Sequence, residues 1–162
     1  MDFNNNLIAS LKNEIPNGVL AVDSQTDIFT VTLERSHLIQ AMSYLKTIAG
    51  FSFLTDLCGI HYPNLLSLGV VYHLHDLKNN RRIRLKTFVN QENPILDSVT
   101  VLFPAANWME RETYDFFGIQ FANHPDLRRI LNENDMSYFP MRKEYPLEDA
   151  SRTDKQDDMF GR

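Results

Sequence analysis

Hydrophobic positions recur with helical spacing in two places within the first fifty residues of this chain. Over residues 3–15 they repeat every three or four positions, which gives one apolar face, and Pro16 then ends the helix. The same spacing over 37–49 predicts a second helix, with Ser36 as a candidate N-cap and Gly50 as its end. We therefore expect two amphipathic helices before the main strands begin.

Strand-like alternation occupies the segments between and after these helices. The strand candidates are residues 19–22, 28–33, 53–62, 68–77 and 83–89. The links between the last three are short and rich in turn residues, which favours antiparallel pairing. The predicted order is α-β-β-α-β-β-β, an α+β fold with a mixed or antiparallel sheet that is covered by helices.

A third helix is predicted over residues 108–117, where a helical apolar stripe returns. Asn107 is a candidate N-cap, and Glu110 lies where the partner of a capping box would lie. Gly118 is placed to end the helix.

The segment beyond this helix is dense in charge and proline and has no sustained apolar period. Such a segment cannot form a core by itself. We therefore expect a single α+β domain over 1–131, which includes the C-terminal helix, and an extended, charged, partner-binding tail over 132–162.

Composition narrows the possible functions. The 162 residues include 16 Lys+Arg and 21 Asp+Glu, a net charge of −5, and a single cysteine, Cys58. This balance argues against a general nucleic-acid binder, and one cysteine allows neither an internal disulfide nor a four-thiolate cluster in this chain alone. No apolar stretch approaches the roughly 18 residues of a membrane span, and the N-terminus does not resemble a signal peptide. We expect a soluble, intracellular protein that reaches a membrane only through a partner.

Two candidate sites for independent chemistry, a histidine pair and the single cysteine, have ordinary structural explanations beside them. His73 and His75 alternate on one predicted strand and could share a metal, but only His61 or Cys58 is even a guess for a further ligand. Two polar side chains on a sheet face explain the same pattern. Cys58 itself lies in an apolar strand pattern, where a thiol is usually inert packing. The glycines are too widely spaced for a phosphate-binding loop.

A predicted strand carries Arg82, Arg84 and Lys86 on one face and apolar residues on the other. Such a basic face could bind a phosphate backbone, meet an acidic protein surface, or simply be solvated. The acidic balance of the chain favours the last two. An RNA-binding sheet ranks lowest, because the interleaved aromatic residues that stack bases are missing.

The third helix and the residues after it carry the densest set of recognition residues. Trp108, Glu112 and Asp115 fall on a face away from the apolar stripe. Arg111 can pair with Asp115 at i,i+4, and two carboxylates beside a tryptophan give only weak support for acid/base chemistry. Arg128 and Arg129 offer adjacent fork-shaped donors for carboxylates. These residues do not assemble into a catalytic set, so a protein–protein docking module is favoured over an enzyme.

The same segment resembles a known signature. WMERETYDFFGI at 108–119 and HPDLRRIL at 124–131 resemble the signature of the C-type subunits of the proton-translocating NADH:quinone oxidoreductases, the 30 kDa-type subunit of the peripheral arm of respiratory complex I. Every fixed position of the family pattern is filled. The likeness extends to Asp56 and to residues 71–74, 104–108 and 141–147.

This resemblance implies a cofactor-free structural subunit of an oxidoreductase, without an active site of its own. NADH, FMN, the iron–sulfur clusters and the quinone would be carried by partner subunits. The partners would be the quinone-pocket subunit and neighbouring cluster-bearing subunits, at the cytoplasmic side of the cell (inner) membrane. Two alternatives stay open, a homologous subunit of a membrane-bound hydrogenase or related oxidoreductase, and a free metal-dependent enzyme that uses the His73/His75 face.

The resemblance also assigns interface or structural roles, rather than catalytic ones, to the signature residues. These are Trp108, Glu110, Arg111, Glu112, Asp115, Gly118, His124, Pro125, Asp126, Arg128 and Arg129. We expect the charged members to form buried ion pairs that hold the segment rigid for docking. Arg128→Ala should then impair assembly, because loss of one partner leaves the other charge buried and unpaired.

Overall fold

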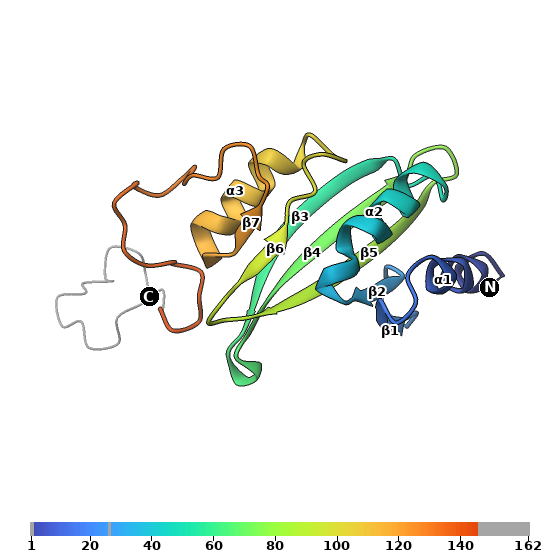
Figure 1. The fold of residues 1–162 in the computed structure, drawn as a ribbon, viewed down its shortest axis with the longest axis horizontal. Helices are drawn as coiled ribbons and strands as arrows, with labels where there is room; N and C mark the ends of the chain where they lie inside the picture. Colours follow the sequence, from blue (N-terminus) through green and yellow to red (C-terminus); the bar gives the residue numbers. More distant parts are fainter. Residues whose placement is uncertain (1, 26, 146–162) are drawn as a thin grey trace, which may run out of the picture.

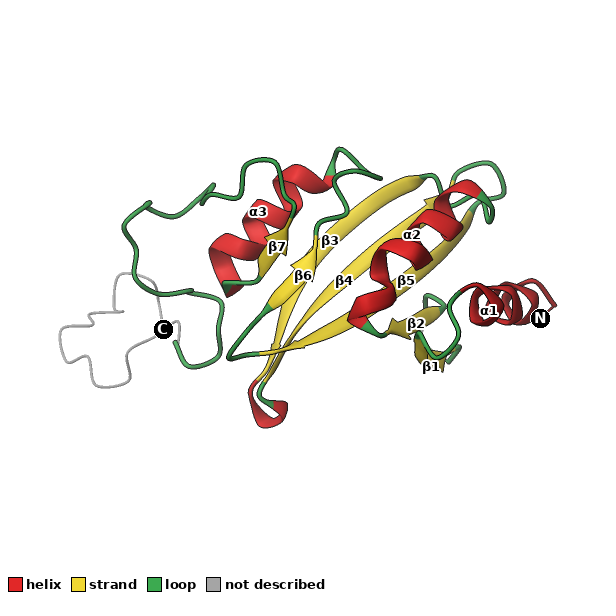
Figure 2. Ribbon diagram, in the orientation of Figure 1, coloured by secondary structure: helices red, strands yellow, loops and turns green. Residues whose placement is uncertain are grey.

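A five-stranded sheet forms the centre of the protein, and helices and a short strand pair lie on one side of it (Figures 1 and 2). The computed structural model describes residues 2–25 and 27–145. The main strands are β1 (Val19–Asp23), β2 (Thr30–Leu33), β3 (Phe53–Tyr62), β4 (Ser67–Asp76) and β5 (Arg81–Asn90). The helices are α1 (Asp2–Glu14), α2 (Leu38–Thr47) and α3 (Ala106–Phe117), with the short 3-10 helices η1 (Arg35–His37) and η2 (Pro63–Leu65).

The spatial order of the sheet differs from its order along the chain. The strands lie in the order β1-β2-β5-β4-β3, with β2 parallel to β5 and all other neighbours antiparallel. Thr30 of β2 is opposite Arg84 of β5. The predicted α+β fold and the element order are confirmed, and the sheet is mixed.

The core lies between the sheet and the elements that cover it. Alternate residues of the strands are buried on this side, among them Leu33 of β2, Tyr72 of β4 and Leu85 of β5. From α2, Met42 and Leu45 are fully buried against them. Burying one large apolar side chain stabilises a fold by roughly 1.5–3 kcal/mol, so this alternation fixes which sheet face is covered.

The expected N-cap of α2 is absent. Ser36 lies inside η1, where its Oγ is 3.1 Å from Nδ1 of its neighbour His37. His37 holds the N-cap position of α2 and makes no side-chain capping hydrogen bond with the residues that the structure describes. The chain enters α2 through a tighter turn instead. The helix ends at Thr47, two residues before the predicted end, and Gly50 closes the turn that follows with a φ of +88°, which lets the N–H of Phe51 donate to the Leu45 carbonyl at 2.9 Å.

The loop expected after residue 94 contains a small parallel strand pair, β6 (Ile95–Asp97) with β7 (Gln120–Ala122). Helix α3 starts at Ala106, so Asn107 is inside the helix and does not cap it. Backbone turns before the helix supply the first contacts, because the N–H of Ala106 donates to the Phe103 carbonyl. The predicted capping box is therefore wrong.

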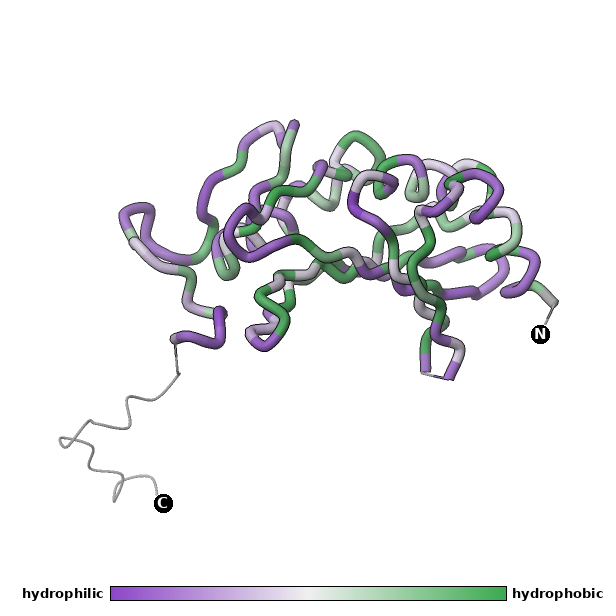
Figure 3. Tube along the Cα trace, turned by 60° about the horizontal axis from the view of Figure 1, so that its bottom comes forward, coloured by the Kyte–Doolittle hydropathy of each residue, from purple (hydrophilic) through white to green (hydrophobic). Residues whose placement is uncertain are grey.

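Residues 132–145 form no helix or strand and are largely hydrophilic (Figure 3). They nevertheless contact their own domain. The N–H of Met141 donates to the Phe116 carbonyl at 3.1 Å, and the Nε of Arg142 donates to the Phe117 carbonyl at 2.7 Å. Partner binding by the tail stays a prediction, and residues 146–162 lie outside the described residues. Among the described helices, none has the length and apolar character needed to span a bilayer.

Candidate docking site around helix α3

The carboxylate of Asp115 anchors the loop that follows α3. Its side chain is fully buried. Oδ1 accepts hydrogen bonds from Nη1 of Arg129 at 2.8 Å and from Nδ2 of Asn132 at 3.1 Å. Oδ2 accepts from the backbone N–H groups of Ile130, Leu131 and Asn132 at 3.1, 2.8 and 2.9 Å. Burial alone would raise the pKa of this carboxyl, but these donors hold the pKa of Asp115 well below its ordinary value.

Arg129 links Asp115 to residues 136–138, which lie further along the chain. With Asp115 it forms a buried ion pair, in which the two side chains are 7% and 0% exposed. Its Nη2 donates to the carbonyls of Met136 and Tyr138 at 2.6 and 3.0 Å. The expected partner Arg111 is not bound to Asp115, and it donates instead to the carbonyls of Arg128 and Arg129. The loop after α3 therefore places Arg129 against Asp115, in place of Arg111 from the helix itself.

The carboxyl of Glu110 lies in the interior between α3 and the segment that follows β6. Its Oε2 lies 2.6 Å from Oγ of Ser98, and its Oε1 accepts the N–H of Val99 at 2.7 Å. Nε2 of His124 lies 3.9 Å from Oε2, and both side chains are fully buried. Burial raises the pKa of Glu110 to about 7 against the opposing effect of its hydrogen bonds. Glu110 therefore connects α3 to the segment after β6, and it does not cap the helix.

His124 locks the start of the loop onto the helix. Its Nδ1 accepts the N–H of Asp126 at 3.0 Å, so the ring proton of the neutral imidazole belongs on Nε2. That Nε2–H then donates to the carbonyl of Asn107 at 3.1 Å. Pro125 and Asp126 are exposed between these two contacts, so the turn projects from the surface.

Arg128 does not form the buried ion pair that was expected. Its Nε donates to Oδ2 of Asp126 at 2.8 Å, but the side chains are 69% and 54% exposed. The two residues lie on the projecting turn, two positions apart, where water screens them. Exposed pairs contribute about 0–1 kcal/mol, so this one does not hold the fold together. The buried-pair hypothesis is wrong for Arg128.

Several signature residues point outward beside this rigid frame. Trp108 is 62% exposed on α3, and Glu112 follows one turn later on the same side. Leu131 is 67% exposed on the loop that Asp115 and Arg111 fasten to the helix. We call Trp108, Glu112, Arg128 and Leu131 the signature face. It combines exposed apolar groups with charges on a fixed backbone.

Gly118 ends α3 with a φ of +74°. A Cβ built there would lie 2.5 Å from the ring of Phe139, whereas at Gly50, φ +88°, the nearest atoms are 3.7 Å away. We expect Gly118→Ala to lower the free energy of unfolding by about 3 kcal/mol, from backbone strain plus overpacking, and Gly50→Ala by about 1 kcal/mol from strain alone. Urea denaturation of both variants tests this. Equal losses would show that the Phe139 ring moves aside at no cost.

The predicted metal ligands have other partners. Nε of Arg84 donates to Nε2 of His73 at 2.7 Å, and Nδ1 of His73 lies 3.6 Å from Oδ2 of Asp56. His75 contacts Oδ1 of Asn80 at 3.3 Å. In the part of the chain that the structure describes, no group of three or more His, Cys, Asp or Glu residues could hold a metal ion. The structure gives the metal-enzyme alternative no support.

Cys58 is exposed, so the expectation of buried packing is wrong. It lies on edge strand β3 at an alternate position to Leu57, which faces the core. Partial burial and the nearby carboxylates of Asp56 and Glu112 raise the pKa of the Cys58 thiol. This environment disfavours the thiolate and a nucleophilic role.

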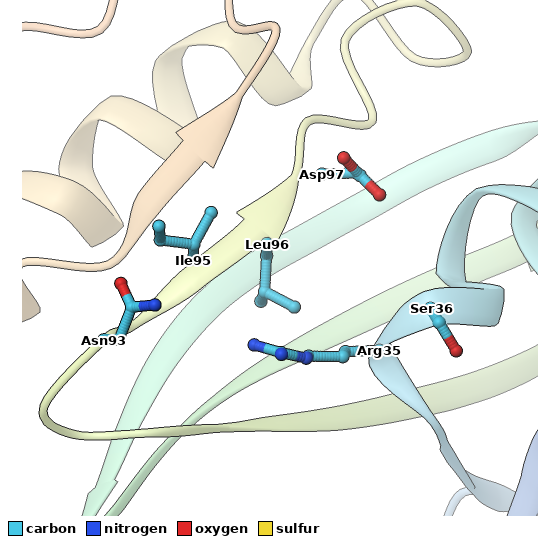
Figure 4. Close-up of a pocket in the computed structure, with 6 residues that line it drawn as sticks. All are labelled: Arg35, Ser36, Asn93, Ile95, Leu96 and Asp97. Atoms are coloured by element: carbon cyan, nitrogen blue, oxygen red, sulfur yellow. The ribbon is translucent and has the colours of Figure 1, made fainter.

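A surface hollow of about 320 Å³ lies between η1 and β6 (Figure 4). It is lined by Arg35, Ser36, Asn93, Ile95, Leu96 and Asp97. Only Leu96 among these is buried, and the set contains no nucleophile paired with a base. The residues that line this hollow are therefore not arranged as an active site.

Comparison with known proteins identifies the family. Residues 31–151 match the family described as "Respiratory-chain NADH dehydrogenase, 30 Kd subunit". The C-type subunit of the NADH-quinone oxidoreductase of Citrifermentans bemidjiense is 37% identical over 156 residues, 94% of this chain and 95% of that protein. That of Methylobacterium sp. (strain 4-46) is 44% identical over 124 residues, 75% of this chain, and the match covers 57% of that longer protein.

Two solved structures have a similar fold. The trypsin-resistant fragment of Nqo5 superposes with a TM-score of 0.66 at 30% identity, over 76% of this chain and 98% of the fragment. A chain of an archaeal membrane-bound sulfane sulfur reductase shares the fold, with a TM-score of 0.75 at 17% identity over 89% of this chain and 86% of that one. This chain belongs to the family of the 30 kDa subunit of respiratory-chain NADH dehydrogenase, which is the C-type subunit of NADH-quinone oxidoreductases.

Proposed function

We propose that this chain serves the NADH-quinone oxidoreductase as a structural subunit that docks other subunits and carries no redox group itself. The observation that supports this most is the signature face beside α3. Exposed Trp108 and Leu131 lie on a backbone that the buried Asp115–Arg129 pair holds in place. Tryptophan and arginine dominate the binding energy of protein interfaces, and a preorganised surface loses little entropy on binding.

The buried and exposed signature residues have separate tasks in this proposal. Asp115, Arg129, Glu110 and His124 fix the shape of the helix and loop from inside. The signature face then presents its apolar groups and charges to the partner. A residue of the first kind acts on stability, and a residue of the second kind acts on assembly.

The partner proposed for this face is the subunit that forms the quinone pocket, with cluster-bearing subunits alongside. The flavin, iron–sulfur clusters, NADH and quinone would be held by those partners. The chain would lie at the cytoplasmic side of the membrane and reach it only through the complex. The tail over 132–162 would extend onto the same partners, continuing the path that residues 132–145 take along α3.

Trp108→Ala tests the docking role. We expect the isolated chain to unfold at the same urea concentration as the wild type, because the indole is exposed. Incorporation into the membrane complex should fall by about tenfold or more, the effect of losing a central aromatic anchor. Co-purification of tagged chain with other subunits from mild-detergent membrane extracts measures incorporation, and NADH:quinone activity follows it.

Leu77→Ala is the matched control, because Leu77 is an apolar residue of nearly equal exposure, 61%, in the turn between β4 and β5. It should leave assembly unchanged. Full incorporation and activity of Trp108→Ala would show that the signature face is not the docking surface. The subunits that co-purify also distinguish an NADH-quinone oxidoreductase from a hydrogenase-type complex built on the same fold.

A further inference from the structure

The sheet has a second face that no described element covers. Helices α2 and α3 and the β6–β7 pair lie on one side of β3, β4 and β5 (Figures 1 and 2). On the other side the alternating residues of β5 are Arg82, Arg84 and Lys86. Neighbouring β4 places His75 opposite Arg82, and His73 opposite Arg84. We call these five residues the basic face.

Two cations of the basic face are not neutralised. Arg84 is shared between His73, at 2.7 Å, and the exposed carboxylate of Asp27, at 3.5 Å. The side chains of Arg82 and Lys86 have no hydrogen bond or ion pair with any described residue. Lys86 is only half-exposed beside Val71, which is 5% exposed. The alkyl stem of Lys86 therefore covers Val71, as the long stems of lysines commonly do while their charged ends stay in water.

The charge on this face contrasts with that of the whole chain. The protein carries a net charge of −5, yet these adjacent strand positions are basic or histidine. An ordered row of cations on rigid strands is complementary to a surface of carboxylates. The residues that alternate with these cations along β5, Ile83 and Leu85, are buried aliphatic residues rather than exposed aromatic ones, which disfavours a nucleic acid whose bases would stack between the cations.

We infer that the basic face is a second docking surface, separate from the signature face, and that it binds an Asp/Glu-rich surface of another subunit of the same complex. The inference rests on the proposed function only in taking the partner from that complex. The two surfaces lie on different elements, the signature face on α3 and the loop after it and the basic face on β4 and β5. Arg82 and Lys86 would supply the unpaired positive charges for the acidic partner.

Zero-length carbodiimide cross-linking of the purified complex tests this directly, because it joins a lysine amine to a carboxylate in contact with it. We expect Lys86 to be joined to an Asp or Glu of another subunit, identified by mass spectrometry. Lys12 and Lys78 are the matched controls, since both are exposed lysines on other elements. Cross-links of Lys86 that lead only to carboxylates in residues 146–162 of this chain would overturn the inference.

Acetylation of the complex and of the isolated full chain with an N-hydroxysuccinimide ester gives a second measurement. Lys86 should react about tenfold more slowly in the complex than in the isolated chain, as an amine held against a carboxylate surface does. Equal rates in the two samples would overturn the inference. Protection that disappears after nuclease treatment would do so as well, by assigning the face to a nucleic acid.

Charge reversal separates this inference from the proposed function. The double variant Arg82→Glu, Lys86→Glu should lower incorporation into the complex about tenfold or more, through like-charge repulsion, while Lys12→Glu, Lys78→Glu should leave it unchanged. If the basic-face variant assembles normally and Trp108→Ala does not, the second docking surface is wrong and the proposed function stands. If the wild-type chain does not co-purify with other subunits, the proposed function itself is wrong.

Discussion

Replacing Asp115 with asparagine is expected to lower the free energy of unfolding by about 3–5 kcal/mol, because it leaves the charge of Arg129 buried and unpaired. The amide also presents only one acceptor oxygen, where the carboxylate now receives donors on both. Asn132 and the backbone N–H groups before it would lose part of their hydrogen bonding. Urea denaturation followed by circular dichroism measures the change.

The exposed pair on the same loop provides the control. Asp126→Asn removes a carboxylate from Arg128 at the same 2.8 Å distance as in the buried pair, but in water. Its cost should lie within about 0–1 kcal/mol. A cost for Asp115→Asn as small as that for Asp126→Asn would mean that the loop is held by packing rather than by the buried carboxylate.

Stability should fall as the pH rises from about 4.5 to about 7, because Glu110 titrates in that range. Its ordinary pKa is 4.5, and burial raises it to about 7 in the folded chain. The folded state therefore binds the proton more tightly than the unfolded state, so the stabilisation is full below pH 4.5 and is lost as the pH approaches 7. The lost part amounts to about 3 kcal/mol. Unfolding free energies at pH 4.5, 5.5 and 7 measure this slope.

Glu110→Gln isolates the contribution of this carboxyl. A glutamine reproduces the protonated form, since its amide can donate to Oγ of Ser98 while its oxygen still accepts the N–H of Val99. The variant should therefore lose most of the slope between pH 4.5 and 7 and be more stable than the wild type at pH 8. Asp115 acts in the opposite sense, because its lowered pKa makes stability fall when the pH drops below the ordinary range of aspartate. An unchanged slope in Glu110→Gln would assign the pH dependence to another group.

The long strands were predictable because their alternation is a local signal that extends over many residues. β3 begins and ends at the predicted residues, and β4 and β5 differ from prediction by one or two positions. β6 and β7 are each three residues long, too short for a period to show. The parallel pairing of β2 with β5 joins distant segments, and no local pattern carries that information.

The same contrast between local patterns and long-range contacts explains which features of the site could be predicted. Trp108 could be placed from the helical period and Gly118 from the preference for glycine at the end of a helix, and both lie where predicted. The partner of Asp115 could not, because the local rule for helices offered Arg111 and the folded loop supplied Arg129. Glu110 and Asn107 matched a capping pattern, but backbone turns had already satisfied the start of α3. Local rules gave the residues that matter, and tertiary contacts decided their roles.

The position of β2 has a consequence for synthesis on the ribosome. β2 lies between β1 and β5, so the chain from Thr30 onward is made long before Arg84 exists to pair with it. Until β5 emerges, one edge of β2 has no partner strand, and the apolar side chains of Val31 and Leu33 lack the neighbours on β5 beside which they are buried in the fold. An unpaired strand edge is a template for pairing with another chain. Nascent chains of this protein should therefore depend on chaperones most strongly before β5 leaves the exit tunnel, and much less once it has.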